Sequence, residues 1–198
     1  MAKDIIVGID AGTSILKVVA FTLNGKEIAS SSKKNKYKTS HGGQATQSLD
    51  ATWKNCIKII SELKNKINNF KDRVAIISVT GQGDGTWLID KKGKPVCDAW
   101  LWLDSRSSDI AKKLSKLNSE KLRFDLTGTG IFAGQQSSQI SYMDKNNPEI
   151  LDQSSTAFHC KDWIYFKLTN VRATDPSEAC FTFGNFRTRQ YDKNVIDG

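Results

Sequence analysis

The amino-acid sequence predicts an α/β fold in which helices flank a mixed central sheet. The apolar run Ile5–Ile9 is typical of a buried strand, and Val18–Phe21 follows closely enough to be the return strand of a hairpin. After the turn signal Asn24-Gly25, residues 26–32 can add a third strand, so the chain opens as an antiparallel meander. A second buried strand, Val74–Val79, follows a helical segment and is most simply parallel to the first.

Helices are predicted where apolar residues recur at helical spacing. The longest such pattern follows Ser48, a candidate N-cap, and ends near Asn68-Asn69. Its apolar positions are Leu49, Trp53, Cys56, Ile57, Ile60, Leu63 and Ile67. Further helices are expected over residues 107–117, 120–126, 135–145 and 161–168, and short strands over 87–90, 100–104 and 157–160. Residues 33–43 are polar and are expected to form a loop.

The charge and the cysteines argue against several classes of protein. The 198-residue chain has a formal net charge of +8, but its lysines are spread along the sequence. The one dense group, Lys33–Lys38, holds a single aromatic residue and no recognisable nucleic-acid module, so no nucleic-acid partner is predicted. No segment is long enough to cross a membrane. The four cysteines are far apart, which favours free thiols in a reducing cytoplasm over disulfides or a zinc site.

The turn between the first two strands carries the residue types of a phosphate and metal site. Its sequence is Asp10-Ala11-Gly12-Thr13-Ser14. Gly12 lets the backbone approach an anion closely, and the hydroxyls of Thr13 and Ser14 can donate to phosphate oxygens. Asp10 can hold Mg²⁺, directly or through water, because this ion takes few protein carboxylates. An ordinary tight turn explains the same residues about equally well.

A second polar segment, Thr80–Thr86, follows the strand at 74–79. Ligands collect at the carboxyl ends of strands in an open α/β sheet, so this segment is a candidate binding site. Gln82 offers an amide and Asp84 a carboxylate, while the glycines around them, Gly83 among them, leave room for a small polyhydroxylated ligand. A flexible glycine loop between strands is an alternative of equal weight.

Two tryptophans and an acid–base pair follow. Aromatic faces stack on the C–H faces of sugars and polyols, so Trp102 is a candidate wall of the same site. Trp100 is expected in the core. Arg106 can pair with Asp104 or anchor the helix that follows it.

The histidines and the common catalytic motifs give no further candidate. Nothing in the spacing of His41 or His159 marks a catalytic base, and both are expected to be packed or on the surface. No HExxH, Walker A or GxGxxG pattern occurs. Zinc proteases, P-loop enzymes and Rossmann dehydrogenases therefore lose support.

Four segments occur in the order found in a known family. They are Gly8–Ser14, Val79–Gln82, Trp102–Arg106 and Lys161–Glu178. Together they resemble the N-terminal domain of the FGGY carbohydrate kinases, of the actin and hexokinase superfamily, and the resemblance covers almost the whole chain. It implies a ribonuclease H-like core, with sugar bound in a cleft against a second domain.

The resemblance also implies roles for individual residues. The residues that would face the ATP phosphates are Asp10, Gly12, Thr13, Ser14 and Lys17. Asp10 would also be the ligand of Mg²⁺. The residues that would contact the substrate are Gln82, Gly83, Asp84, Trp102 and Asp104. Residues 81–87 and 159–163 are most similar to family members that act on erythritol, so ATP-dependent phosphorylation of erythritol is predicted.

The general-base aspartate of the family would lie beyond Gly198. Residues 1–198 are therefore expected to be a truncated N-terminal domain without its C-terminal kinase domain, with no catalytic residue of its own and no turnover alone. Two alternatives stay open: a family kinase that acts on xylulose or another polyol, and a non-catalytic fragment that binds polyol. A homodimer is a further partner arrangement that the sequence leaves open.

Overall fold

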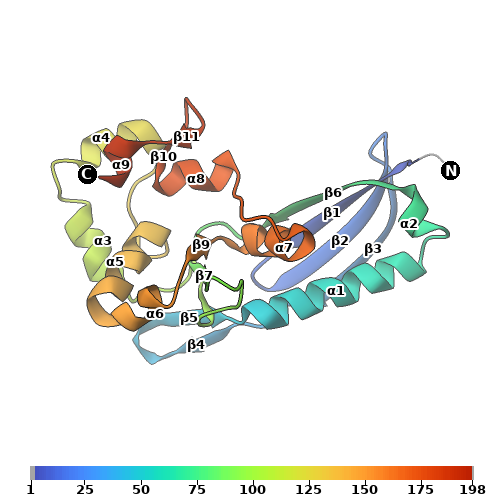
Figure 1. Ribbon diagram of the computed structural model, residues 1–198, viewed down its shortest axis with the longest axis horizontal. Coiled ribbons are helices and arrows are strands. Elements are labelled where there is room, and N and C mark those ends of the chain that lie inside the picture. Colours follow the sequence, from blue (N-terminus) through green and yellow to red (C-terminus); the bar gives the residue numbers. More distant parts are fainter. Residues whose placement is uncertain (1–2, 198) are drawn as a thin grey trace.

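Figure 1 presents the computed structural model of the chain, which describes residues 3–197. The molecule is elongated. A twisted sheet and one long helix form one end, and a group of short helices forms the other.

The central sheet has four strands in the order β3-β2-β1-β6. β1 (Ile5–Ala11), β2 (Ile15–Thr22) and β3 (Glu27–Lys34) form an antiparallel meander. β6 (Val74–Gly81) lies parallel to β1. The structure thus confirms the predicted meander and the predicted parallel strand. Both strands of the parallel pair continue past their apolar runs, so that the polar residues after them reach the same edge of the sheet.

The long helix α1 (Leu49–Asn65) covers one face of this sheet (Figure 1). Ser48 caps it as predicted: its hydroxyl accepts a hydrogen bond from the Ala51 amide at 3.2 Å. The buried positions of the helix are Leu49, Thr52, Cys56, Ile59 and Leu63. The prediction that Ile57 belongs to the buried pattern was wrong. Ile57 is 47% exposed, because it lies about 100° around the helix from Cys56 and so points away from the sheet.

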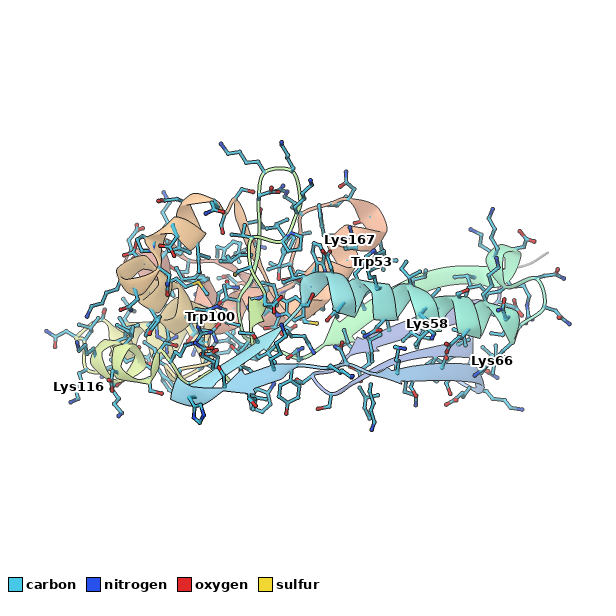
Figure 2. The ribbon with its side chains drawn as sticks, turned by 90° about the horizontal axis from the view of Figure 1, so that it is seen from below. Trp53, Lys58, Lys66, Trp100, Lys116 and Lys167 are labelled. Atoms are coloured by element: carbon cyan, nitrogen blue, oxygen red, sulfur yellow. The ribbon has the colours of Figure 1, made fainter. Side chains whose placement is uncertain are left out.

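A second helix, α7 (Cys160–Thr169), packs against α1 and against the β1–β6 pair. Trp163 is fully buried in this layer and donates from Nε1 to the Leu49 carbonyl oxygen at 2.9 Å. The ammonium of Lys167 lies 5.2 Å from the centre of the Trp163 ring and 5.7 Å from that of Trp53 (Figure 2). Residues about a hundred positions apart are thereby fixed in one core.

Short elements complete the chain. The helices are α2 (Phe70–Arg73), α3 (Ser108–Leu114), α4 (Glu120–Thr127), α5 (Gln136–Asn146), α6 (Pro148–Asp152), α8 (Pro176–Thr182) and α9 (Lys193–Ile196). The strands are β4 (Lys38–Ser40), β5 (Gln44–Gln47), β7 (Trp87–Ile89), β8 (Ala99–Trp100), β9 (Thr156–Phe158), β10 (Gly184–Asn185) and β11 (Gln190–Tyr191). They pair as β4-β5-β8, β7-β9 and β10-β11.

Two predictions for these connections were wrong. The expected loop at 33–43 holds the end of β3, strand β4 and a 3-10 turn, because β4 pairs with β5 and gains ladder partners that its polar sequence does not indicate. The strand expected over 100–104 ends at Trp100. There the chain turns, and the Asp104 amide donates to the Leu101 carbonyl oxygen at 2.9 Å.

The cysteines are free thiols, as predicted. Cys56, Cys160 and Cys180 are buried and Cys97 is partly buried. Burial raises the pKa of the Cys56 thiol to about 12, which leaves it protonated and unreactive at neutral pH. None of the helices between residues 3 and 197 combines enough length with enough apolar character to cross a lipid bilayer.

The cap of α1 can be tested directly. Ser48→Ala leaves the Ala51 amide without its partner, so we expect the free energy of unfolding to fall by about 1 kcal/mol. Denaturant titration followed by circular dichroism measures this loss. Ser61→Ala, on the exposed side of the same helix, is the matched control and should change stability by less than about 0.5 kcal/mol. Equal losses in both variants would argue against the capping role.

Candidate active site

The first candidate group lies on the turn between β1 and β2. A Cβ at Gly12 would lie 2.6 Å from the Ile15 carbonyl oxygen, so any side chain there would force the turn to move. Asp10 and Ser14 are exposed on either side of it. The turn therefore requires glycine at this position and presents a carboxylate and a hydroxyl to solvent.

Three successive carbonyl oxygens of this turn accept hydrogen bonds from two buried side chains and a backbone amide. Asn35 donates from Nδ2 to the Gly12 oxygen at 3.1 Å and from its amide to the Ser14 oxygen at 2.8 Å. Gln47 donates from Nε2 to the Thr13 oxygen at 3.0 Å. Because both donor residues are buried, the turn is held from the protein side and its opposite side is left to solvent or a ligand.

A closed ring of hydrogen bonds joins this turn to the exit of β6. Thr13 donates from Oγ1 to Gln82 Oε1 at 2.9 Å, and Gln82 donates from Nε2 to Gln47 Oε1 at 2.8 Å. The Gln47 bond to the Thr13 carbonyl oxygen closes the ring. Trp102 adds to it, since its Nε1 donates to Thr13 Oγ1 at 3.1 Å. Sequence reasoning missed Gln47, whose only signal is a polar residue just before the N-cap of α1.

The exit of β6 is a tight turn around Asp84. This residue has φ 53°, in the left-handed region that aspartate tolerates better than most residues, and Gly85 follows with φ 76°. A Cβ at Gly85 would lie 2.5 Å from the Trp100 carbonyl oxygen. Burial, followed by the negative charge of Glu178, raises the pKa of Asp84 to about 6, although His159 acts in the opposite direction. Asp84 is therefore a carboxyl group that changes charge near neutral pH.

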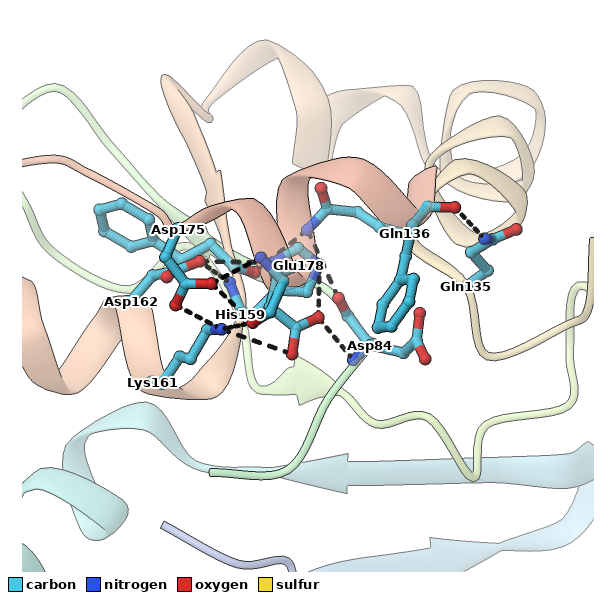
Figure 3. A network of polar contacts seen from close by, with 12 residues as sticks. Asp84, Gln135, Gln136, His159, Lys161, Asp162, Asp175 and Glu178 are labelled. Atoms are coloured by element: carbon cyan, nitrogen blue, oxygen red, sulfur yellow. Dashed lines mark hydrogen bonds and ion pairs between the residues drawn. The ribbon is translucent and has the colours of Figure 1, made fainter. Parts of the chain in front are cut away.

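Behind this turn lies a charged cluster in which His159, Lys161, Asp162 and Glu178 are buried and Asp175 is exposed (Figure 3). Asp162 accepts from the His159 amide at 3.0 Å and lies 3.3 Å from His159 Nδ1. Lys161 Nζ lies 2.6 Å from Asp175 Oδ2. Of the two places expected for His159, packed or on the surface, the structure shows the packed one. The cluster itself was not predicted, because it depends on how α8 packs beside the start of α7.

Trp102 and Asp104 lie in different environments. Trp102 is 46% exposed, as a wall of a binding site requires. Asp104 is 1% exposed, and its carboxylate accepts from Arg106 Nη2 at 2.7 Å and from the Ala45 amide at 2.9 Å. The Arg106 guanidinium in turn lies 3.3 Å from the ring centre of buried Trp100. The predicted Asp104–Arg106 pair and the core position of Trp100 are confirmed. The structure does not present Asp104 to a ligand, because protein donors use its oxygens.

A hollow of about 250 Å³ adjoins Asp10 on the face of the sheet opposite α1. Asp10 lies opposite Lys17 of β2 and Thr80 of β6, and all three line the hollow. Between residues 3 and 197 no three His, Cys, Asp or Glu side chains are grouped to hold a metal by themselves. One carboxylate beside an ammonium does fit Mg²⁺ that brings its own water and phosphate ligands, and Asp10 is the residue that would hold it.

Comparison with known proteins identifies the family. Residues 5–198 match the model of the N-terminal domain of the FGGY family of carbohydrate kinases. The chain belongs to this family. It is 53% identical over 194 residues to erythritol kinase from Brucella abortus (strain 2308), a match that covers 98% of this chain and 37% of that relative. The chain thus spans less than half the length of that protein.

Solved structures confirm the fold class. A xylulose kinase from Rhodospirillum rubrum superposes with a TM-score of 0.90 at 20% identity, covering 98% of this chain and 40% of the other. Plasmodium falciparum glycerol kinase with ADP superposes with a TM-score of 0.85 at 23% identity, covering 99% and 40%. At these identities the likeness is one of fold, and it agrees with the ribonuclease H-like α/β class predicted from the sequence.

The hydrogen-bonded ring makes a prediction about stability. Gln82→Met keeps the length of the side chain but leaves Gln47 Oε1 without its donor in a buried place, so we expect the free energy of unfolding to fall by about 1–3 kcal/mol. Denaturant titration measures the change. Gln153→Met, at an exposed position after α6, is the control. A loss no larger than that of the control would contradict the stabilising role of the ring.

Asp84 makes a prediction about pH. Because folding raises its pKa from 3.8 to about 6, the stabilising contribution of Asp84 is complete below 3.8 and is lost as the pH rises through about 6. Asparagine stays neutral and tolerates φ > 0, so Asp84→Asn should stabilise the protein at about pH 7, with the gain shrinking as the pH falls toward 4. Denaturant titrations over this pH range measure the difference in the free energy of unfolding between variant and wild type. The contributions of the other carboxylates cancel in this difference. A gain independent of pH would contradict the assignment.

Proposed function

We propose that this chain is part of an ATP-dependent kinase that converts erythritol to erythritol phosphate. The observation that carries the proposal is the ring through which Thr13 of the hairpin and Gln82 of the β6 exit are joined. In a member of a carbohydrate kinase family, such a joint would suit a phosphate site on the hairpin and a polyol site at the β6 exit. The 53% identity to the Brucella abortus erythritol kinase supports erythritol as the substrate.

In this proposal the β1–β2 hairpin binds the phosphates of ATP. Gly12 lets the backbone come close to the phosphates, and the exposed hydroxyl of Ser14 donates to their oxygens. The Thr13 hydroxyl gives its hydrogen to Gln82 within the ring, so Thr13 acts by holding the hairpin in place. Lys17, across the strand pair from Asp10, adds a positive charge. When bound, Mg²⁺ on Asp10 would supply neutralisation of the phosphate charge.

The polyol lies beside the exit of β6. Asp84 accepts hydrogen bonds from its hydroxyls, and the exposed ring of Trp102 packs against its C–H face. The missing side chain at Gly83 leaves room for the Glu178 carboxylate behind Asp84. Gln82 acts by holding the hairpin and the β6 exit in register, because both ends of its amide are used within the ring. Asp104 supports the segment that carries Trp102.

Transfer itself requires groups that the family resemblance expects beyond Gly198. The attacking hydroxyl gives its proton to an aspartate of that segment, and closure of a second domain over the cleft excludes water, so that ATP is not hydrolysed. The part described here therefore contributes binding and positioning. In this proposal the chain alone binds polyol weakly and does not turn over.

The proposal is tested by measuring ADP release from the full-length gene product. Erythritol is compared with glycerol, xylitol, ribitol, D-xylulose and L-xylulose. We expect the highest kcat/KM with erythritol. Asp84→Ala should lower that value by about 10- to 100-fold, the range expected for loss of a hydrogen bond to a charged group. Asp109→Ala, at an exposed carboxylate of α3, is the control and should retain wild-type activity.

The possible results are distinct. Preference for xylulose or another polyol would keep the kinase and overturn the choice of substrate. Absence of ADP release with every compound would overturn the kinase and favour a binding role. Full activity of the Asp84 variant would remove this residue from the polyol site.

A further inference from the structure

Glu178 is a buried carboxylate directly behind the Asp84 turn. It lies on α8, is 6% exposed, and accepts a hydrogen bond from the Asp84 amide on Oε2 at 3.2 Å (Figure 3). Within residues 3–197 this is the only hydrogen bond of the Glu178 side chain. Glu178 lies in the first turn of α8, where an acid favours the helix dipole, but Asp175 is the residue that caps this helix.

Glu178 also occupies the space beside Gly83. A Cβ built at Gly83 would lie 3.1 Å from Glu178 Oε1, closer than nearly all real contacts of this kind. A side chain at position 83 would therefore push the carboxylate away. Gly83 and Glu178 therefore depend on each other, because the carboxylate fits here only while position 83 has no side chain.

We propose that Glu178 is a positioning and specificity-determining residue for the polyol, acting through the Gly83–Asp84 turn that it holds from behind. This inference rests on the function proposed above. In it, Glu178 fixes the direction of the Asp84 side chain and sets the charge that the polyol hydroxyls meet. It does not touch the substrate.

The groups around Glu178 explain how it controls charge. His159 Nε2 lies 3.8 Å from Oε2, and Lys161 Nζ lies 3.8 Å from Oε1. Lys161 is closer to Asp175, at 2.6 Å, and so compensates Glu178 only in part. Asp162 is turned toward His159. Burial, followed by the charge of Glu178 beside it, raises the pKa of Asp84.

Two variants of the full-length protein separate the hydrogen bond of Glu178 to the Asp84 amide from the effect of its charge. Glu178→Gln keeps an acceptor for the Asp84 amide but removes the charge, whereas Glu178→Ala removes both. The ionised form of Asp84 accepts hydroxyl donors, so the acid limb of kcat/KM for the polyol should lie near pH 6 in the wild type. We expect Glu178→Gln to move this limb down by about one pH unit with only a small change in KM at high pH.

Glu178→Ala should release the turn. We expect the KM for the polyol to rise by about 10-fold while the KM for MgATP stays within about two-fold of the wild type. Hydrogen exchange of the peptide covering residues 82–87 should speed up in Glu178→Ala and stay near wild type in Glu178→Gln. Glu62→Gln is the matched control, since Glu62 accepts a hydrogen bond from Ser31 of β3 and should change none of these values.

An unmoved acid limb in Glu178→Gln, or an unchanged polyol KM and unchanged exchange in Glu178→Ala, would overturn the proposal. Equal rises in the KM for polyol and for MgATP would assign Glu178 a merely structural role. If the wild-type protein phosphorylates no polyol, the proposed function fails. Hydrogen exchange of residues 82–87, which needs no substrate, then still decides whether Glu178 holds the turn.

Discussion

The candidate site depends on the closed ring of hydrogen bonds among Thr13, Gln47 and Gln82. Each of these side chains belongs to a different part of the chain: the first hairpin, the strand before α1 and the exit of β6. Gln47 and Gln82 are buried, and unpaired amide atoms in a buried place cost about 1–3 kcal/mol each. The three segments can therefore satisfy these groups only in one mutual register.

This register explains why the two candidate binding segments share one position in space. β1 and β6 are parallel neighbours, so the sheet alone brings their carboxyl ends to the same edge. The ring adds a direct bond between the segments that follow them, and Trp102 joins it through Thr13. A displacement of the hairpin is thus transmitted to the β6 exit through the Thr13 and Gln82 side chains, which the ring holds in place.

The sequence predicted most of what depends on local pattern. Apolar runs or helical spacing correctly indicated β1, β2, β6 and α1. The residue types around Gly12 likewise indicated a turn. Predictions failed where a distant partner decides. β4 has no apolar pattern and forms because β5 is beside it. Asp104 is of a residue type that often binds ligands, yet its carboxylate is buried and accepts from Arg106 and the Ala45 amide. The residues next to Gln47 and Glu178 in the sequence do not indicate their roles, because the contacts that define these roles join distant segments.

The charged cluster around Glu178 is costly for a fold of this size. Four carboxylates, on Asp84, Asp162, Asp175 and Glu178, gather around one lysine and one histidine. Buried carboxylates reduce stability unless they are well paired, and the carboxylate that Lys161 pairs with closely is the exposed one, on Asp175. Two of the four have structural work, since Asp162 and Asp175 cap α7 and α8.

Glu178 and Asp84 cap no helix, and the Glu178 carboxylate accepts from the Asp84 amide. Two neighbouring carboxylates that cap no helix and lie at a polar turn are characteristic of a functional site rather than of a stabilising one. The same comparison separates Asp84 from Asp104. Asp104 is compensated by Arg106 and the Ala45 amide and serves the fold, whereas burial and the charge of Glu178 raise the pKa of Asp84. Of the acidic residues around this turn, Asp84 is therefore the one that we propose for the polyol.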